Sequence, residues 1–363
     1  MRIGKESYRS IWWNDKVQAV EIIDQRYLPY EFKIAKLQSL EDFEKAIREM
    51  WVRGAPLIGV TAGYGMACAA TIDPSDEHIE QAWLRLNSTR PTAINLRWAL
   101  DLCKSEILTR PQQHRSNAAI DLAHRLAEED VETNRLLGAH GLSIIKAIAS
   151  TKRAGDPVRI LTHCNAGWLA TVDYGTATSP IYQAHDAGVP VHVFVDETRP
   201  RNQGALTAWE LLNHGVPHDY IVDNAGGHLM QCGEIDLVIT GTDRTTANGD
   251  VCNKIGTYLK ALAAKDNDIP FYVALPSSTI DWRLDTGASI PIEERAADEV
   301  HYIQGMTGNE ELNTVKVTPK TTKCRNPAFD VTPNRLITGL ITERGACQAT
   351  TQSLKTLFSD TEN

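Results

Sequence analysis

Reactive and polar side chains recur in this sequence directly after short runs of apolar, β-branched residues. Cys164 follows the run 158–163, and Asp243 follows the run 235–240 after a Gly-Thr pair. Because ligands of open α/β sheets lie beyond the carboxyl ends of the strands, we expect these two side chains to meet in one crevice. A thiol and a carboxyl group, with cations nearby, are the groups that acid–base work on a small anionic substrate requires.

Cys164 is the strongest candidate for a reactive side chain. The Asn-Ala-Gly sequence that follows it offers free backbone N–H groups, and such groups at a helix start lower the pKa of a thiol. The alternative is a buried structural cysteine, which is the usual state of an unpaired one. His163 is adjacent in sequence, but successive strand residues face opposite ways, so we do not expect a Cys–His nucleophile pair.

Asp243 has two interpretations. It stands beside Arg244 after the predicted strand, so an ion pair or a helix cap would explain it. The functional alternative is a carboxylic acid that a dry pocket keeps protonated, so that it can donate a proton.

Three cations are candidates for holding a phosphate group. Arg53 and Arg90 lie where helical patterns break, next to Gly54 and Pro91. Most arginines are surface residues, so neither is decisive alone. Lys254 follows an Asn-Gly turn at the start of a predicted helix, and helix N-termini bind phosphate, to which a lysine adds a point charge.

The elements that must position these residues follow from hydrophobic periodicity. Apolar residues at helical spacing, the first series preceded by Ser39 as a cap, predict helices over 40–52, 57–71, 78–87, 93–109 and 116–150. Short apolar runs that alternate with helical stretches predict buried parallel strands at 158–163, 189–195, 220–222, 235–240 and 271–275. The charged cluster Glu128, Glu129, Asp130 and Glu132 is interpreted as a solvated helix face.

This order of elements predicts an α/β protein in which a helical N-terminal domain precedes a Rossmann-like parallel-sheet domain. The expected divisions are a mainly helical domain over 1–125, a connecting helix over 126–150 and an α/β catalytic domain over 151–363. No Gly-x-Gly-x-x-Gly motif follows a predicted strand, so the sequence gives no evidence of dinucleotide binding.

The composition of the chain limits the kinds of partner that it is expected to bind. Of the 363 residues, 37 are Lys or Arg and 46 are Asp or Glu, which gives a net charge of −9. An acidic chain without a basic run predicts no nucleic-acid partner and no anionic membrane surface. We expect no apolar stretch to reach the ~18 residues that a membrane-spanning helix needs. Seven cysteines without a CxxC pair predict free thiols in a reducing cytoplasm, and no ligand spacing predicts a metal.

Several long motifs, in order along the chain, carry a family resemblance. They are VRGAPLIGVTAGYG at 52–65, RPTAINL at 90–96, LTHCNAG at 161–167, DETRP at 196–200, GTDRTTANGDVCNKIGTY at 241–258, IPIEER at 290–295 and NPAFDVTPNRLITGLITERG at 326–345. With these motifs the sequence resembles the methylthioribose-1-phosphate isomerases, which are related to the alpha, beta and delta regulatory subunits of the eukaryotic translation-initiation guanine-nucleotide exchange factor.

The resemblance implies an aldose–ketose isomerase that acts as a homodimer without a redox cofactor or a metal. Its substrate would be a 5-modified ribose 1-phosphate, 5-methylthioribose 1-phosphate first and 5-deoxyribose 1-phosphate second. The anomeric carbon carries the phosphate, so the sugar cannot open to a free aldehyde. A hydrogen must move from C2 to C1 while the C1–O bond of the ring breaks.

The resemblance also implies roles for individual residues. Asp243 would donate a proton to the ring oxygen. Cys164 would lie at C1 and C2, either as the base of an enediolate route or as part of the environment for a hydride shift. The residues that match the segments holding substrate and phosphate are Arg53, Gly54, Ala55, Arg90, Gln203, Asn253 and Lys254.

Two other functions stay open at this stage. A ribose-1,5-bisphosphate isomerase would need extra cations near C5, and the sequence identifies none. A non-catalytic regulatory subunit predicts loss of the thiol and the acid, whereas Cys164 and Asp243 both stand inside intact motifs.

Overall fold

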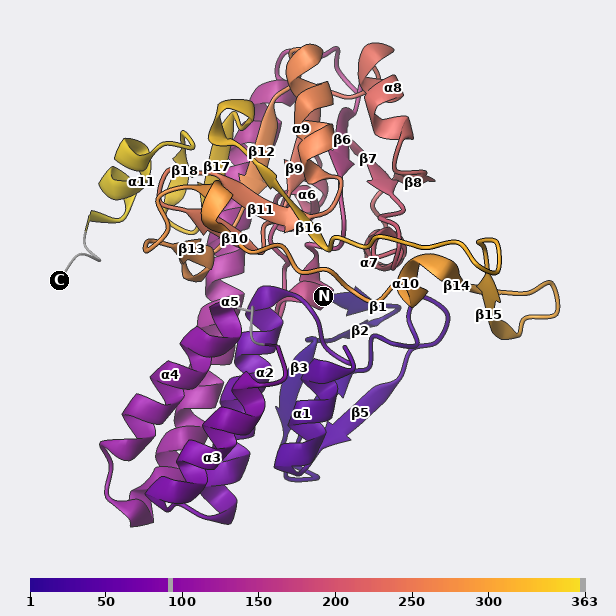
Figure 1. The fold of residues 1–363 in the computed structure, drawn as a ribbon. Helices are drawn as coiled ribbons and strands as arrows, with labels where there is room; N and C mark the ends of the chain where they lie inside the picture. Colours follow the sequence, from indigo (N-terminus) through magenta and orange to yellow (C-terminus); the bar gives the residue numbers. More distant parts are fainter. Residues whose placement is uncertain (91–93, 360–363) are drawn as a thin grey trace.

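The computed structural model describes residues 1–90 and 94–359. Figure 1 shows a helical half and a sheet half, with one long helix passing through both. The expected α/β fold class, a helical N-terminal part followed by a parallel-sheet part, is confirmed. The positions of the domain boundaries at 125 and 150 stay a prediction.

The chain begins with strands, which the helical interpretation of its first third missed. A small hairpin precedes a three-stranded antiparallel sheet; the strands are β1 (Arg2–Ile3), β2 (Glu6–Ser7), β3 (Ile11–Asn14), β4 (Ala19–Ile23) and β5 (Ile34–Leu37). All five residues of β4 are buried. A strand buried on both faces shows no alternation of polar and apolar residues, so its periodicity is easily missed.

Five helices follow, and each was predicted to within a few residues. They are α1 (Leu40–Arg48), α2 (Ala55–Ile72), α3 (Asp76–Asn87), α4 (Ile94–Leu108) and α5 (Gln112–Ala149). Ser39 caps α1 as expected: its Oγ accepts from the Asp42 N–H, and the Asp42 carboxylate accepts from the Ser39 N–H. This reciprocal pair satisfies two N–H groups that the helix start leaves without partners.

Helix α2 corrects one expectation. Its 18 residues have a mean hydropathy of 1.4, which is long and apolar enough to cross a membrane by length and composition alone. However, 72% of this stretch is buried inside the protein, where it packs against α4 and α5. A helix that is buried inside the protein in this way is a core helix. The glycine and alanine residues of α2 let the neighbouring helices approach closely. The absence of a membrane partner stays a prediction.

A seven-stranded sheet forms the core of the second half. Its strand order is β18-β17-β12-β9-β6-β7-β8, and the bounds are β6 (Val158–Thr162), β7 (Val191–Asp196), β8 (His218–Ile221), β9 (Leu237–Thr240), β12 (Phe271–Ala274), β17 (Gly339–Thr342) and β18 (Gly345–Cys347). All neighbours pair in parallel except β17 and β18. The sequence predicted five of these strands and missed the last two.

Helices cover both faces of this sheet (Figure 1). They are α5, α6 (Ser179–Asp186), α7 (Gly204–His214), α8 (Ala225–Gln231) and α9 (Thr257–Asp266). Of the other two helices, α11 (Thr351–Leu357) packs on β18 at the edge of the sheet, and α10 (Asp298–His301) lies outside the sheet. Adjacent residues of β6 show the two faces: Ile160 packs with α5 and α6, whereas Leu161 packs with α8 and α9. Burial on both faces explains why the strands are continuous apolar runs.

A smaller sheet lies beyond the carboxyl ends of the central strands and has the order β13-β10-β11-β16. Its strands are β10 (Arg244–Thr246), β11 (Val251–Lys254), β13 (Ile280–Asp281) and β16 (Phe329–Thr332). A separate hairpin, β14 (Tyr302–Met306) with β15 (Leu312–Lys316), projects at the side of the molecule (Figure 1). Asp243 directly precedes β10 and Lys254 ends β11, so this sheet places both at the crevice.

The charged cluster on α5 is only partly a solvated face, contrary to the expectation. Glu128 and Glu129 are exposed, but the Asp130 carboxylate accepts hydrogen bonds from the Val172 N–H at 2.7 Å and from Asn134 Nδ2 at 3.1 Å. Burial raises the pKa of Asp130 to about 7. Asp130 therefore joins the long helix to the loop that follows Cys164 in the chain.

We predict that Asp130 makes stability depend on pH. Its folded-state pKa lies above the value of the unfolded chain, so the folded state holds the proton more tightly and loses stability as pH rises from about 4 to 7. Thermal unfolding measured from pH 4 to 8 should show a smaller loss in Asp130→Asn than in the wild type. Glu129→Gln, on the exposed face, is the matched control. Parallel curves for Asp130→Asn and wild type would contradict this role.

Candidate active site

All nine residues that the sequence singled out line one cavity of about 100 Å³. Its walls come from the start of α2, the loop after β6, the segment before α7, the turn after β9 and the end of β11. The expectation that strand ends deliver these groups to one crevice is therefore confirmed. The roles of the individual residues stay predictions.

Cys164 is half-buried and has a left-handed backbone, with φ 65°. Such a conformation costs about 1–3 kcal/mol for a residue other than glycine, and it persists only where the surroundings hold it. Thr198 Oγ1 accepts from the Cys164 N–H at 2.8 Å, and Thr207 Oγ1 donates to the Cys164 carbonyl at 2.9 Å. Burial raises the pKa of the thiol, although Arg53 and Lys254 oppose this. The net effect on the pKa of the Cys164 thiol is upward, which disfavours the thiolate.

Asp243 meets the condition for a proton donor. Burial raises the pKa of its carboxyl group, against the opposing effect of Lys254 and Arg90. Glu293, which also lines the cavity, raises the pKa further because a nearby negative charge disfavours a second one. Asp243 therefore keeps its proton to higher pH than an ordinary aspartate, while its backbone N–H is fixed by the Cys252 carbonyl at 3.0 Å.

The start of α2 is built to receive an anion. Gly54 has φ 90°, and a Cβ there would lie 2.3 Å from the Ala170 carbonyl oxygen, so only glycine fits. The following N–H groups at this helix start carry positive partial charge and no acidic residue lies in the first turn. Arg53 donates to Asn165 Oδ1 through Nη2, and its buried Nε has no hydrogen-bond partner among the described residues. That free donor is available to a ligand.

Gln203 and Lys254 line the same cavity. Gln203 Oε1 is buried without a hydrogen-bond partner within the described ranges. The Lys254 ammonium donates to the Ala328 carbonyl at 2.9 Å and lies 4.5 Å from the centre of the Phe329 ring. One expectation is corrected: Lys254 ends β11, and α9 begins only at Thr257. Lys254 thus contributes its own charge to the cavity and does not stand on a helix start.

Sequence reasoning missed two further cations and their partners. Arg201 and Arg295 line the cavity, and both bind Glu299, at 2.9 and 2.6 Å. Arg295 also binds Glu293 at 3.1 Å. Both arginines were within reach of the motif search, since Arg201 directly follows DETRP and Arg295 ends IPIEER. Their acidic partners reduce the positive charge that they offer to a ligand.

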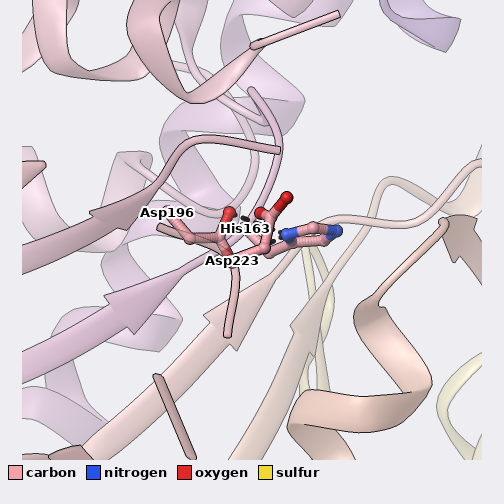
Figure 2. A group of neighbouring side chains, drawn as sticks. All are labelled: His163, Asp196 and Asp223. Atoms are coloured by element: carbon pink, nitrogen blue, oxygen red, sulfur yellow. Dashed lines mark hydrogen bonds and ion pairs between the residues drawn. The ribbon is translucent and has the colours of Figure 1, made fainter. Parts of the chain in front are cut away.

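His163, Asp196 and Asp223 form a group whose ligand atoms lie within 4.8 Å of one another (Figure 2). Protein donors already bind these carboxylates. Asp196 accepts from His163 Nδ1 at 2.8 Å and from the Lys260 ammonium at 2.6 Å, and Asp223 accepts two backbone N–H groups at 2.7 Å. An ammonium inside the group disfavours a cation there, so the group does not fit a metal. That the reaction needs no metal stays a prediction.

His163 is not paired with Cys164, as the alternation of strand residues predicted. Its Nδ1 binds the Asp196 carboxylate, and its Nε2 lies 2.9 Å from the Ile255 carbonyl. Both ring nitrogens are thus hydrogen-bonded to oxygen atoms of other residues, and neither is free to pair with the thiol.

A model of the Initiation factor 2 subunit family matches residues 51–349. The chain belongs to this family. The methylthioribose-1-phosphate isomerase of Brucella anthropi is 62% identical over 362 residues, which are 99% of this chain and 100% of that protein. The protein of the same name from Escherichia coli is 57% identical over 360 residues, 99% of this chain and 97% of the relative.

Two solved structures are similar to this chain over nearly its whole length. The 5-methylthioribose 1-phosphate isomerase of Pyrococcus horikoshii has a TM-score of 0.84 and 39% identity, covering 98% of this chain and 97% of that one. The translation initiation factor eIF-2B, subunit delta, from A. fulgidus has a TM-score of 0.81 and 38% identity, covering 97% and 100%. The resemblance read from the motifs is confirmed, and so is the expectation that the chain is an enzyme, an isomerase.

We predict that Lys254→Ala weakens binding of a sugar 1-phosphate by roughly tenfold or more, because a hydrogen bond to a charged group contributes about 1.5–3 kcal/mol. Calorimetric titration measures this dissociation constant directly. Lys265→Ala, which removes an exposed lysine from the far end of α9, is the control and should bind as the wild type does. An unchanged affinity in Lys254→Ala would place the phosphate elsewhere.

Proposed function

We propose that this protein is a cytoplasmic aldose–ketose isomerase that converts 5-methylthioribose 1-phosphate into 5-methylthioribulose 1-phosphate. The observation that carries the proposal is one small cavity lined by a carboxyl group whose pKa burial raises, a thiol and several cations. Relatives that cover the whole chain at about 60% identity bear the name of this activity. Methionine salvage is the process that follows from that name.

Binding begins with the phosphate. Arg53, Arg90 and Lys254 supply positive charge, and the start of α2 supplies backbone N–H groups. Because the phosphate is attached to C1, this clamp also fixes the carbon at which the ring must open. Several of the lining groups are buried, and charge interactions are stronger away from bulk water.

Asp243 then drives ring opening. Its protonated carboxyl group donates to the ring oxygen while the C1–O bond breaks, and the oxygen leaves as a hydroxyl group instead of an alkoxide. A carboxyl group with an ordinary pKa would be ionised at neutral pH and could not make this donation. Burial therefore supplies the state that this step needs.

Cys164 acts at C1 and C2 in one of two ways. In an enediolate route its thiolate removes the C2 proton to give an enol, and the resulting thiol returns that proton to C1 while the C2 hydroxyl gives its own proton to the Asp243 carboxylate and becomes the ketone. In a hydride route the hydrogen moves with its electron pair from C2 to C1, the C2 hydroxyl loses its proton to form the ketone, and the thiol is part of the surroundings. Both routes give the same ketose 1-phosphate and end with Asp243 protonated again.

The charges also bear on the alternative substrates. Arg201 and Arg295 are the extra cations that a ribose 1,5-bisphosphate would need, but Glu299 and Glu293 bind them. A second phosphate would have to displace these carboxylates. This arrangement favours one phosphate and an uncharged 5-substituent, for which 5-deoxyribose 1-phosphate is the second candidate.

We also propose that the protein works as a homodimer. Large apolar side chains are exposed near the free edge at β8 and on the projecting β14–β15 hairpin: Tyr220, Val222, Tyr302, Met306, Val315 and Val317. Exposed apolar groups in such number are typical of a surface that another chain covers.

The direct test is a panel of sugar 1-phosphates that differ only at C5, with the ketose product followed by mass spectrometry. We predict turnover of the 5-methylthio compound. Cys164→Ser and Asp243→Asn should each lower kcat by at least ~10²-fold, the lower range for acid–base groups, with little change in thermal unfolding. Cys232→Ser, which changes an exposed thiol on the surface, should leave kcat unchanged. No turnover of any member of the panel would favour the non-catalytic regulatory function.

The pH dependence of kcat/KM distinguishes the two routes. Since burial raises the pKa of Asp243, we predict an inflection above the ordinary range of an aspartate. If only the acid must be protonated, as in the hydride route, the rate falls as pH rises through that pKa. If Cys164 must also be ionised, the rate instead rises with pH up to the pKa of Asp243 and then stays level. Above that pKa the loss of protonated Asp243 is offset by the growing fraction of thiolate, whose pKa burial also raises. A profile with no inflection above the usual carboxyl range would contradict the proposed acid.

A further inference from the structure

Two residues with strained backbones are hydrogen-bonded to each other beside the cavity. Cys164 has φ 65° and Thr198 has φ 58°, both in the left-handed region that residues other than glycine rarely adopt. The conformation is most unfavourable for a β-branched residue such as threonine. The Cys164 N–H donates to Thr198 Oγ1 at 2.8 Å, so the two strained residues hold each other.

Carboxylates fix the backbone and the hydroxyl group of Thr198. Asp223 accepts the N–H groups of Thr198 and Arg199, each at 2.7 Å. Asp196 Oδ1 accepts from the Thr198 hydroxyl at 2.8 Å. Asp196 ends β7 and Asp223 follows β8. Their carboxylates, both shown in Figure 2, therefore hold the left-handed turn at Thr198.

Asp196 is itself fully buried and held from two further sides. His163 Nδ1 lies 2.8 Å from Oδ1, and the Lys260 ammonium lies 2.6 Å from Oδ2. Because these donors keep the carboxylate ionised and oriented, it must accept the single hydroxyl proton of Thr198. The oxygen lone pairs of Thr198 are then left to accept the Cys164 N–H.

Thr207 completes the support on the other side of Cys164. Its Oγ1 donates to the Cys164 carbonyl at 2.9 Å and accepts from Asn165 Nδ2 at 3.0 Å. Asn165 in turn accepts from Arg53. The N–H and the carbonyl of Cys164 are thus both bound by threonine hydroxyls, which sets the direction of its Cα–Cβ bond.

We propose that Thr198 is a positioning residue for the Cys164 sulfur: through its hydroxyl group it transmits the fixed orientation of Asp196 and Asp223 to the strained Cys164 backbone. This inference rests on the proposed isomerase activity for its kinetic consequence. Thr198 touches no reacting atom and acts only through Cys164. In this proposal His163, Asp196 and Asp223 serve to hold Thr198 in place, and this role involves no metal.

The test compares three variants of the full-length protein. Thr198→Val keeps the shape and removes the hydroxyl group, whereas Thr198→Ser keeps the hydroxyl group. Thr162→Val is the matched control, because Thr162 is equally buried in β6 and its hydroxyl donates only to the Ile239 carbonyl at 2.8 Å. For each we would measure kcat, KM, thermal unfolding and the rate at which iodoacetamide alkylates Cys164, followed on the Cys164 peptide by mass spectrometry.

We expect Thr198→Val to lower kcat by about 10- to 100-fold with KM nearly unchanged, since a small misplacement of a reacting group costs up to about 10²-fold. Its Cys164 should alkylate at least about threefold faster, because the loosened loop lets the thiol leave its orientation. Thr198→Ser should restore both values. The inference is overturned if Thr198→Val matches Thr162→Val in kcat and in alkylation rate.

The alkylation measurement needs no substrate, so it separates this inference from the proposed function. If no sugar phosphate is turned over but Thr198→Val still changes the Cys164 alkylation rate and Thr162→Val does not, the positioning role stands and the isomerase assignment fails. If turnover is present and both valine variants behave alike in every measurement, the isomerase assignment stands and the positioning role fails.

Discussion

The chemistry of this protein depends on a competition at one carboxyl group. Around Asp243, removal from water favours the neutral acid, whereas Lys254, Arg90 and Arg53 favour the carboxylate. In the proposed mechanism the same cations hold the phosphate, so they cannot be removed to ease the competition. Burial prevails in the free protein, with help from Glu293. The site therefore combines two demands that oppose each other in water: an acid that keeps its proton and a clamp for an anion.

The architecture makes this combination possible by taking the groups from different elements. Cys164 follows a strand of the large sheet, Asp243 directly precedes the small sheet, and Lys254 ends a strand of that sheet. The anion-binding helix start comes from the N-terminal half of the chain. No single segment carries both the acid and all the cations, so the spacing between them depends on the packing of the two halves. The long helix α5, with Asp130 bonded to the loop at Val172, helps to fix that packing.

Much of this was predictable from the residues. Apolar runs located the strands that end at the site, and the residues after them proved to line one cavity because parallel strands direct their carboxyl ends to one side. The strands β3–β5 were not predicted, since β4 is buried on both faces and shows no alternation. Asp130 was misjudged because helix periodicity gives the face of a residue but not the loop from a distant segment that covers it. Arg201 and Arg295 stand at the ends of the quoted motifs and could have been considered there, but their approach to the cavity is visible only in the tertiary packing.

The central claim is that Asp243 is a protonated acid in the resting enzyme. Infrared difference spectroscopy between the wild type and Asp243→Asn, recorded across a pH series, isolates the carboxyl band of this residue from those of other buried carboxyl groups such as Asp130, which both proteins contain. We expect a band of the protonated acid that persists above the ordinary aspartate pKa of 3.8, because burial raises the pKa of Asp243. A difference spectrum that shows only ionised carboxylate above that value would contradict it.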